Sequence, residues 1–98
     1  MATKIERGSG NVFADLGFAP EEAANLQLRS DLMIQVRKRL RALGVRQTEA
    51  RRLLGVSQPR VSDLMRGKIE RFSVDTLIKF LGKVGVEVRL TVRRKSPA

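Results

Sequence analysis

The sequence predicts a mainly helical domain of five helices that ends in one short β-strand. Three observations predict this class. Apolar residues recur at helical spacing through the middle of the chain, glycines stand where these stretches must end, and side chains alternate strictly near the C-terminus. The 98 residues fit a single domain with a modest core. We expect five segments, in this order: a flexible N-terminus over 1–11, an apolar segment with a short helix over 12–30, a central helical unit over 31–85, a strand over 86–92 and a basic tail over 93–98.

The first segment has no periodicity and is rich in glycine, serine and charge, so we expect it to be mobile. Val12, Phe13, Leu16 and Phe18 follow it and form what we call the N-terminal apolar cluster. Two interpretations are open. Either the two rings fold back on the helical core, or the cluster is a docking site for a partner protein.

Two helices are expected between Pro20 and Gly44. The first begins at Pro20, and the acidic residues 21–22 lie in its first turn, where they meet the positive helix end. The second covers residues 31–43, with Ser30 as its cap, an apolar stripe and four cations on its other faces. The cations form a solvated surface or bind phosphate without reading sequence. The stripe comprises Met33, Val36, Leu40 and Leu43, and the cations are Arg37, Lys38, Arg39 and Arg41.

Residues 47–68, QTEARRLLGVSQPRVSDLMRGK, predict two short helices joined by a tight turn. Gly55 stands where the first helix must end in a left-handed residue. Ser57 is placed to cap the second helix through its hydroxyl, and Pro59 lies in that helix's first turn. The residues expected to face inward are Leu53, Leu54, Val56, Val61, Leu64 and Met65, and those left outward are Gln58, Arg60, Ser62 and Asp63.

A capped helix with a polar outer face, in a very basic chain, suits the major groove of DNA. The alternative is an ordinary helical hairpin with a solvated face. The charge supports the first interpretation, because the formal charge is +10 and the pI is near 11.5. Residues 1–30 hold three basic and four acidic side chains, whereas residues 31–98 hold seventeen basic and six acidic ones. Such a field attracts nucleic acid.

Gly67 ends the second helix of this pair, and Ser73 is expected to cap a further helix that runs to Gly85. Its buried stripe comprises Val74, Leu77, Ile78, Leu81 and Val84. The period then changes to two, because Val86, Val88, Leu90 and Val92 alternate with Glu87, Arg89, Thr91 and Arg93.

A solitary strand leaves its backbone groups unpaired. The simplest expectation is a homodimer in which residues 86–92 pair antiparallel with the same strand of a second copy across a two-fold axis. Addition to the sheet of another protein and a frayed basic tail are the alternatives. The cations of residues 93–95 belong to the tail or make a further phosphate contact.

The chain contains neither cysteine nor histidine. This excludes disulfides, zinc fingers and thiol nucleophiles, and it removes the commonest general base. Four carboxylates, Glu49, Asp63, Glu70 and Asp75, lie on separate elements without the spacing of metal ligands. We therefore expect no enzyme, no metal and no cofactor. No long apolar run or signal peptide is evident, so a cytoplasmic protein without a membrane span is expected.

With these residues in hand, the chain resembles the Xre/Cro-like helix-turn-helix repressors. The match is closest over GVSQPRVSDLMRGK, preceded by NVFADLGF and followed by KIERFSVDTL. The resemblance covers about residues 11–92 and points to the HigA-type antitoxins, which are encoded beside a RelE/HigB-like ribonuclease toxin. It implies that residues 31–85 form a helix-turn-helix DNA-binding domain of a dimeric repressor, which also neutralises that toxin. The alternative is a stand-alone phage or plasmid repressor of the same fold.

The resemblance also implies residue roles. Gln47 matches a position that binds phosphate, and Arg46, Arg66 and Lys68 suit the same role. Base contacts are implied for Gln58, Pro59 and Asp63. Arg60 and Ser62 are further candidates for base contact, although Arg60 can reach either guanine or phosphate and Ser62 can also contact either. The implied toxin contacts are Phe13, Leu16 and Phe18. Two residues depart from the pattern: Arg51 replaces a small residue at the helix crossing, and Arg46 replaces a capping hydroxyl or amide.

Overall fold

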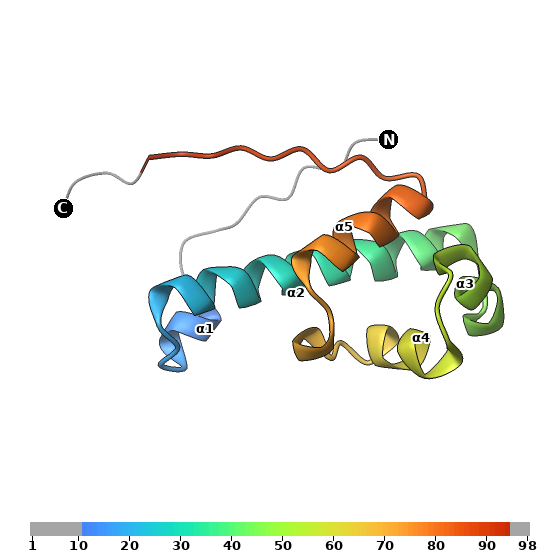
Figure 1. The fold of residues 1–98 in the computed structure, drawn as a ribbon, viewed down its shortest axis with the longest axis horizontal. Helices are drawn as coiled ribbons and strands as arrows, with labels where there is room; N and C mark the ends of the chain where they lie inside the picture. Colours follow the sequence, from blue (N-terminus) through green and yellow to red (C-terminus); the bar gives the residue numbers. More distant parts are fainter. Residues whose placement is uncertain (1–10, 95–98) are drawn as a thin grey trace.

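The computed structural model describes residues 11–94, and it is helical with one extended segment at its end (Figure 1). The elements are α1 (Val12–Asp15), α2 (Pro20–Leu43), α3 (Gln47–Leu54), α4 (Gln58–Met65), a 3-10 turn η1 (Ile69–Arg71) and α5 (Val74–Lys83). The flexible N-terminus expected over residues 1–11 lies outside the described residues except for Asn11, as does the end of the basic tail, residues 95–98.

The longest element, α2, replaces the two helices predicted between Pro20 and Gly44. It is one continuous helix of 24 residues, and Ser30 lies in its interior instead of capping a second helix. The start at Pro20 and the left-handed end at Gly44, with φ of 67°, are both confirmed. No glycine or proline interrupts the chain between them, so nothing breaks the hydrogen-bond ladder. The predicted boundary at residue 31 therefore falls inside α2.

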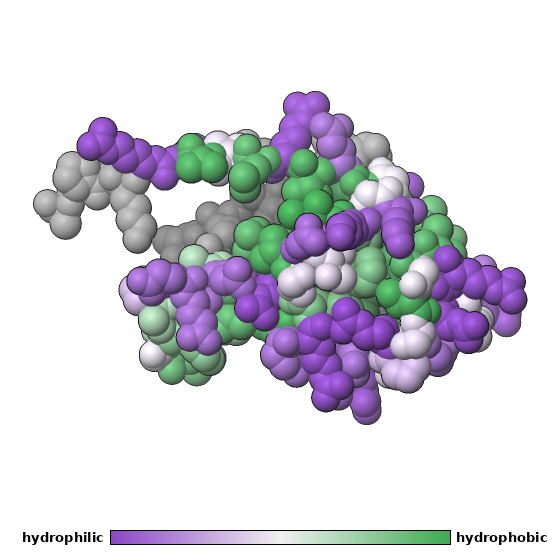
Figure 2. Space-filling view, viewed as in Figure 1, coloured by the Kyte–Doolittle hydropathy of each residue, from purple (hydrophilic) through white to green (hydrophobic). Residues whose placement is uncertain are grey.

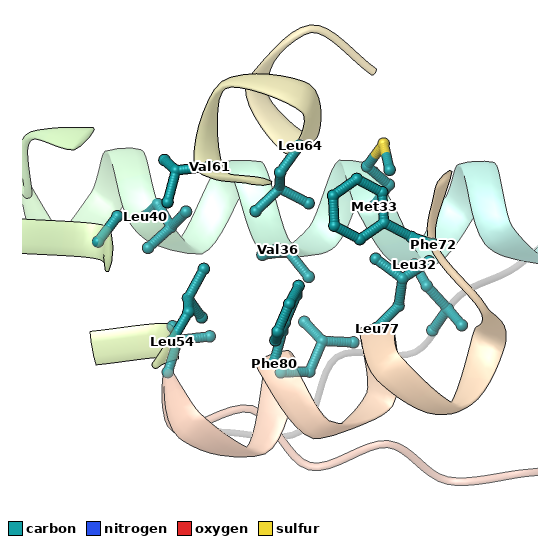
Figure 3. Close-up of a cluster of buried hydrophobic side chains, with 13 residues drawn as sticks. Leu32, Met33, Val36, Leu40, Leu54, Val61, Leu64, Phe72, Leu77 and Phe80 are labelled. Carbon is teal, nitrogen blue, oxygen red and sulfur yellow. The ribbon is translucent and has the colours of Figure 1, made fainter. Parts of the chain in front are cut away.

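The core lies where α2, α3, α4, η1 and α5 meet. Figure 3 shows Val61 and Leu64 reaching from α4 toward Val36 and Leu40 of α2, above Leu54, Leu77 and Phe80. Phe72 and Phe80 pack edge to face, with ring centroids 6.0 Å apart. Three residues predicted to be buried or to face inward are exposed instead: Leu43 at the end of α2, Leu53 near the end of α3 and Ile78 on the outer side of α5.

The N-terminal apolar cluster does not fold into this core. Asn11 caps α1 by accepting hydrogen bonds from the N–H groups of residues 13 and 14, and its side chain donates to the Ala23 carbonyl at 3.0 Å. These bonds hold α1 against the first turns of α2, where Ala23 is buried. Phe13 and Phe18 meet edge to face, with ring centroids 6.2 Å apart. Helix α1 is therefore a small unit at the N-terminal end of α2.

Among residues 11–94, the strand predicted over residues 86–92 is not formed beyond a single bridge position at Glu87. Within residues 11–94 no strand pairs with this segment, which runs extended along α5 and α2 (Figure 1). Val86 and Val88 are half-buried against the core, whereas Leu90 and Val92 are 81% and 83% exposed. One chain therefore supplies apolar cover for only half of the alternating apolar residues.

Candidate nucleic-acid interface

The turn between α3 and α4 has the geometry that the sequence predicts. Gly55 has φ of 70° and ψ of 36°, the left-handed conformation, and its N–H donates to the carbonyl of Arg51. The Nζ of Lys83 donates to the carbonyl of Leu54 at 2.9 Å. An ammonium group from α5 thus satisfies the negative end of α3 and ties the turn to the rest of the domain.

The inner face of α4 anchors it, because Val61 and Leu64 are fully buried. Helical geometry places Pro59, Ser62 and Arg66 in one row on the opposite face, since they lie three and four residues apart. Pro59 and Arg66 are exposed, and Ser62 is half-buried. In Figure 2, hydrophilic residues gather over the side of the molecule formed by α4 and η1. This outward row is the face of α4 on which bases can be contacted.

Gln58 and Gln47 join the first turns of the two motif helices. The side-chain amide of Gln58 donates to the Oε1 of Gln47 at 3.2 Å, and both side chains lie at the protein surface. Each glutamine keeps free hydrogen-bonding capacity, since an amide has two donor hydrogens and an acceptor with two lone pairs. The bond aligns the predicted base-contact residue with the predicted phosphate-contact residue.

Arg60 is turned toward the chain after α4. Its guanidinium lies 4.1 Å above the ring centroid of Phe72, and its Nη1 donates to the carbonyl of Arg71 at 2.6 Å. A planar guanidinium suits both contacts, because it stacks on an aromatic face while its edge donates. The sequence predicts that Arg60 faces outward, whereas the structure places it half-buried against η1 and Phe72.

Asp63 also meets this segment. One carboxylate oxygen lies 3.3 Å from Nη1 of Arg71, and the other lies 3.6 Å from Nζ of Lys68. Its side chain is 15% exposed. Of the predicted base-contact residues, Asp63 and Arg60 are therefore both held by intramolecular contacts.

The N-cap of α4 differs from expectation, whereas the N-cap position of α3 holds the expected departure. Ser57 occupies the N-cap position of α4, but its hydroxyl accepts no capping hydrogen bond. Arg46 precedes α3 and has no acceptor to offer. Instead the side chain of Glu49 accepts from the Arg46 N–H at 3.4 Å, which is one half of a capping box. By contrast, Ser73 caps α5 as predicted, because its hydroxyl accepts from the N–H of Thr76 at 3.1 Å.

The unusual Arg51 does not disturb the helix crossing. Ala50 is the buried small residue of α3, and Arg51 is exposed. An exposed guanidinium is available to phosphate, as are the exposed Arg46 and Arg66. Lys68 is half-buried and paired with Asp63, which leaves part of its ammonium group accessible.

Several cations bind the main chain, and no pattern in the sequence identifies them. Arg39 of α2 donates to the carbonyl of Val84 at 2.8 Å, so it holds the end of α5. Arg29 donates to the carbonyl of Ile69 at 3.4 Å. Lysine and arginine are abundant in this chain, so the sequence holds no signal that separates these structural cations from those that face outward. Of the other three cations predicted on α2, Lys38 and Arg41 are exposed and Arg37 is half-buried.

The predicted partner-contact residues lie at the opposite end of α2 from α3. Leu16 is 70% exposed and Phe18 is 42% exposed, whereas Phe13 is half-buried. Val12, which is not among the predicted contacts, is exposed beside them. In the part of the chain that the structure describes, no helix is both long and apolar enough to span a membrane.

Comparisons with known proteins agree with this geometry. The profile of a family described as "Helix-turn-helix domain" matches residues 12–93. A solved structure whose name assigns it to the XRE family of transcriptional regulators is 30% identical in sequence, with a TM-score of 0.72. The alignment covers 76% of this chain and 83% of that one. No curated protein matches the chain.

Proposed function

We propose that this chain acts as a dimeric repressor at its own operator. The premise is that the chain belongs to the helix-turn-helix domain family and is a DNA-binding transcriptional regulator of the XRE type. The observation that carries the proposal is the outward row of α4. Pro59, Ser62 and Arg66 point away from the core, while the buried Val61 and Leu64 hold α4 in place. Gln58 lies at the edge of this row. A rigidly presented polar helix is what major-groove readout needs.

In this proposal Gln58 pairs with a base edge, Pro59 contacts a thymine methyl and Ser62 contacts either a base or a phosphate. Around the row, Arg46, Gln47, Arg66 and Lys68 bind phosphate, which fixes the register without reading sequence.

The test is selection of bound sequences from a randomised duplex pool, followed by footprinting of the region upstream of the gene. The wild-type chain should enrich one two-fold symmetric sequence. Gln58→Ala should lose the preference at one base pair of each half-site, since a bidentate base contact contributes about 1–3 kcal/mol. Gln27→Ala is the matched control, because Gln27 is a glutamine of α2 whose amide donates to Asp31. Failure of the wild type to prefer any sequence would refute the proposal.

Dimerisation is proposed through the extended C-terminal segment. Leu90 and Val92 are almost fully exposed, and residues 88–94 form neither a strand nor a bridge within the described part of the chain. Antiparallel pairing with a second copy would give the backbone a partner strand and cover the exposed apolar side chains. It would also relate the two α4 helices by a two-fold axis. Half-sites would then lie about 34 Å apart, one turn of the duplex.

Light scattering of the purified chain tests the dimer. Leu90→Asp and Val92→Asp should give monomers with unchanged helix content, whereas Ile34→Asp, at another exposed apolar residue on α2, should leave the dimer intact. A wild-type monomer at micromolar concentration would contradict the dimer but not duplex binding.

The antitoxin role is a second part of the proposal, and the N-terminal apolar cluster favours it. Leu16 and Phe18 expose apolar surface that the domain's own core does not use. Such a patch suits a protein partner. We propose that a RelE/HigB-like toxin docks there and is neutralised by being covered. The stand-alone phage or plasmid repressor is the competing possibility, in which the cluster has no toxin to bind.

Co-purification with the product of the neighbouring gene distinguishes the antitoxin from the stand-alone repressor. Leu16→Asp should abolish capture of that product and retain the preference for the selected duplex. Gln58→Ala should retain the capture and weaken the preference for the selected duplex. A neighbouring gene product that is captured equally by both variants would place the toxin contact elsewhere. Absence of any captured toxin would favour the stand-alone repressor.

A further inference from the structure

Two residues of α4 that chemistry suits for base contact make reciprocal contacts with the segment after α4. Arg60 donates to the main-chain carbonyl of Arg71, and the side chain of Arg71 in turn pairs with Asp63. We call this set of contacts, together with the stack of Arg60 on Phe72 and the pair of Asp63 with Lys68, the η1 clasp. It joins the middle of α4 to η1 and the residues on either side of it.

The clasp is fixed to the core through Phe72. That ring is 1% exposed and packs on Phe80 of α5, so the guanidinium of Arg60 lies against a ring that belongs to the core. Arg60 and Asp63 are three residues apart and therefore share the side of α4 that faces η1. The outward row lies on the adjoining face.

The requirements of base contact conflict with these contacts. For Asp63 to accept from a cytosine amine, its carboxylate must turn away from Arg71 and Lys68, which weakens both ion pairs. For Arg60 to reach guanine, it must leave both the Phe72 ring and a 2.6 Å hydrogen bond. Gln58 and Ser62 need no such rearrangement.

We propose that Arg60, Asp63 and Arg71 are positioning residues that set the angle of α4 on the duplex, and that they do not read bases. The inference rests on the proposed function, because it assigns roles within the same DNA-binding face. Discrimination between base pairs then depends on Gln58, Pro59 and Ser62.

The experiment is a double-mutant cycle measured with duplex DNA. Asp63→Ala, Arg71→Ala and the double variant are assayed for affinity to the sequence that the wild type selects from a randomised pool, and each variant is also put through that selection. The matched control is the same cycle on Asp75 and Lys79, an exposed ion pair of α5 at 3.3 Å, because it makes the same changes of charge. Thermal melting verifies that each variant is folded, and Asp63→Asn replaces Asp63→Ala if the alanine variant is not.

The inference expects each single variant to lose about two- to five-fold in affinity, the range for partly exposed ion pairs. After the affinity change of the control cycle has been subtracted, the double variant should lose no more affinity for the selected duplex than the weaker-binding single variant. All three should rank the bases as the wild type does. Arg60→Met should behave in the same way, since it removes the bond to the Arg71 carbonyl without touching the outward row.

A base contact by Asp63 predicts another pattern. Asp63→Ala would then lose roughly five-fold or more of its discrimination at one base pair, while Arg71→Ala would keep it. That pattern overturns the inference, and so do affinity losses that simply multiply in the double variant. If the wild type selects no sequence at all, the proposed function itself fails, which is a result distinct from either of these.

Discussion

Replacing Gly55 by alanine is expected to destabilise the domain more than the same replacement at Gly44. Both glycines end helices in the left-handed conformation, with φ of 70° and 67°. Their surroundings differ. A Cβ on Gly44 would meet nothing within 4 Å, whereas a Cβ on Gly55 would lie 3.3 Å from the Nζ of Lys83. The pair therefore separates backbone strain from the contact with Lys83.

The magnitudes follow from these two effects. A left-handed alanine costs about 1–2 kcal/mol, and Gly44→Ala should cost this amount alone. At Gly55 the ammonium group must also move, and it is then drawn away from the carbonyl of Leu54, to which it donates at 2.9 Å. Weakening that hydrogen bond adds about 0.5–1.5 kcal/mol. Gly55→Ala should therefore cost about 1.5–3.5 kcal/mol.

Urea unfolding followed by circular dichroism measures both free energies of unfolding. Gly82→Ala is the opposite control, because Gly82 lies inside α5 at an ordinary helical φ with open space around it. It should stabilise the domain by about 0.5–1 kcal/mol. In a Lys83→Met background the extra loss at Gly55 should vanish. Equal losses at Gly44 and Gly55 in the wild-type background would show that Lys83 does not hold the turn.

Three further outcomes are expected. Leu64→Ala should lower the free energy of unfolding by about 2–5 kcal/mol, because it empties a fully buried site between α4 and α2; a decrease of less than about 1 kcal/mol in urea unfolding would mean that α4 is not anchored there. Ser73→Ala should lower the melting temperature, since its capping hydrogen bond contributes about 1 kcal/mol. Ser57→Ala should change the melting temperature little, because that hydroxyl accepts no capping hydrogen bond. Equal shifts of the melting temperature would contradict this difference in capping. Arg66→Ala should reduce the slope of log affinity against log salt by about 0.9 for each phosphate that the side chain neutralises, without altering base preference; an unchanged slope in fluorescence anisotropy titrations would exclude binding of Arg66 to phosphate.

The elements that a local signal defines were predictable from the sequence. Pro20, Gly44, Gly55 and Ser73 begin, end or cap helices where their chemistry requires it. The prediction at Ser30 was wrong because a serine before an acidic residue is typical of a helix cap, although the interior of a long helix also tolerates it. The choice between the two depends on how α2 packs against α5 and α1, which is a tertiary effect.

The outward face of α4 was only partly predictable. Apolar spacing correctly identified Val61 and Leu64 as buried, and helical geometry then defines the opposite row. The positions of Arg60 and Asp63 depend on Arg71 and Phe72, which lie beyond α4. Periodicity within one helix holds no information on such contacts, so the sequence predicts both side chains to be free.

The unbroken α2 has a consequence for how this protein can change over time. At about 1.5 Å per residue its 24 residues form a strut about 36 Å long. The strut keeps α1 at one end well apart from the α3–α4 turn at the other. If the proposed partner docks at α1, substitutions that adapt α1 to it lie far from the DNA-binding side, and the docked partner need not collide with the duplex. The length of one continuous helix thus separates the two surfaces on which the proposed partner and the duplex would lie.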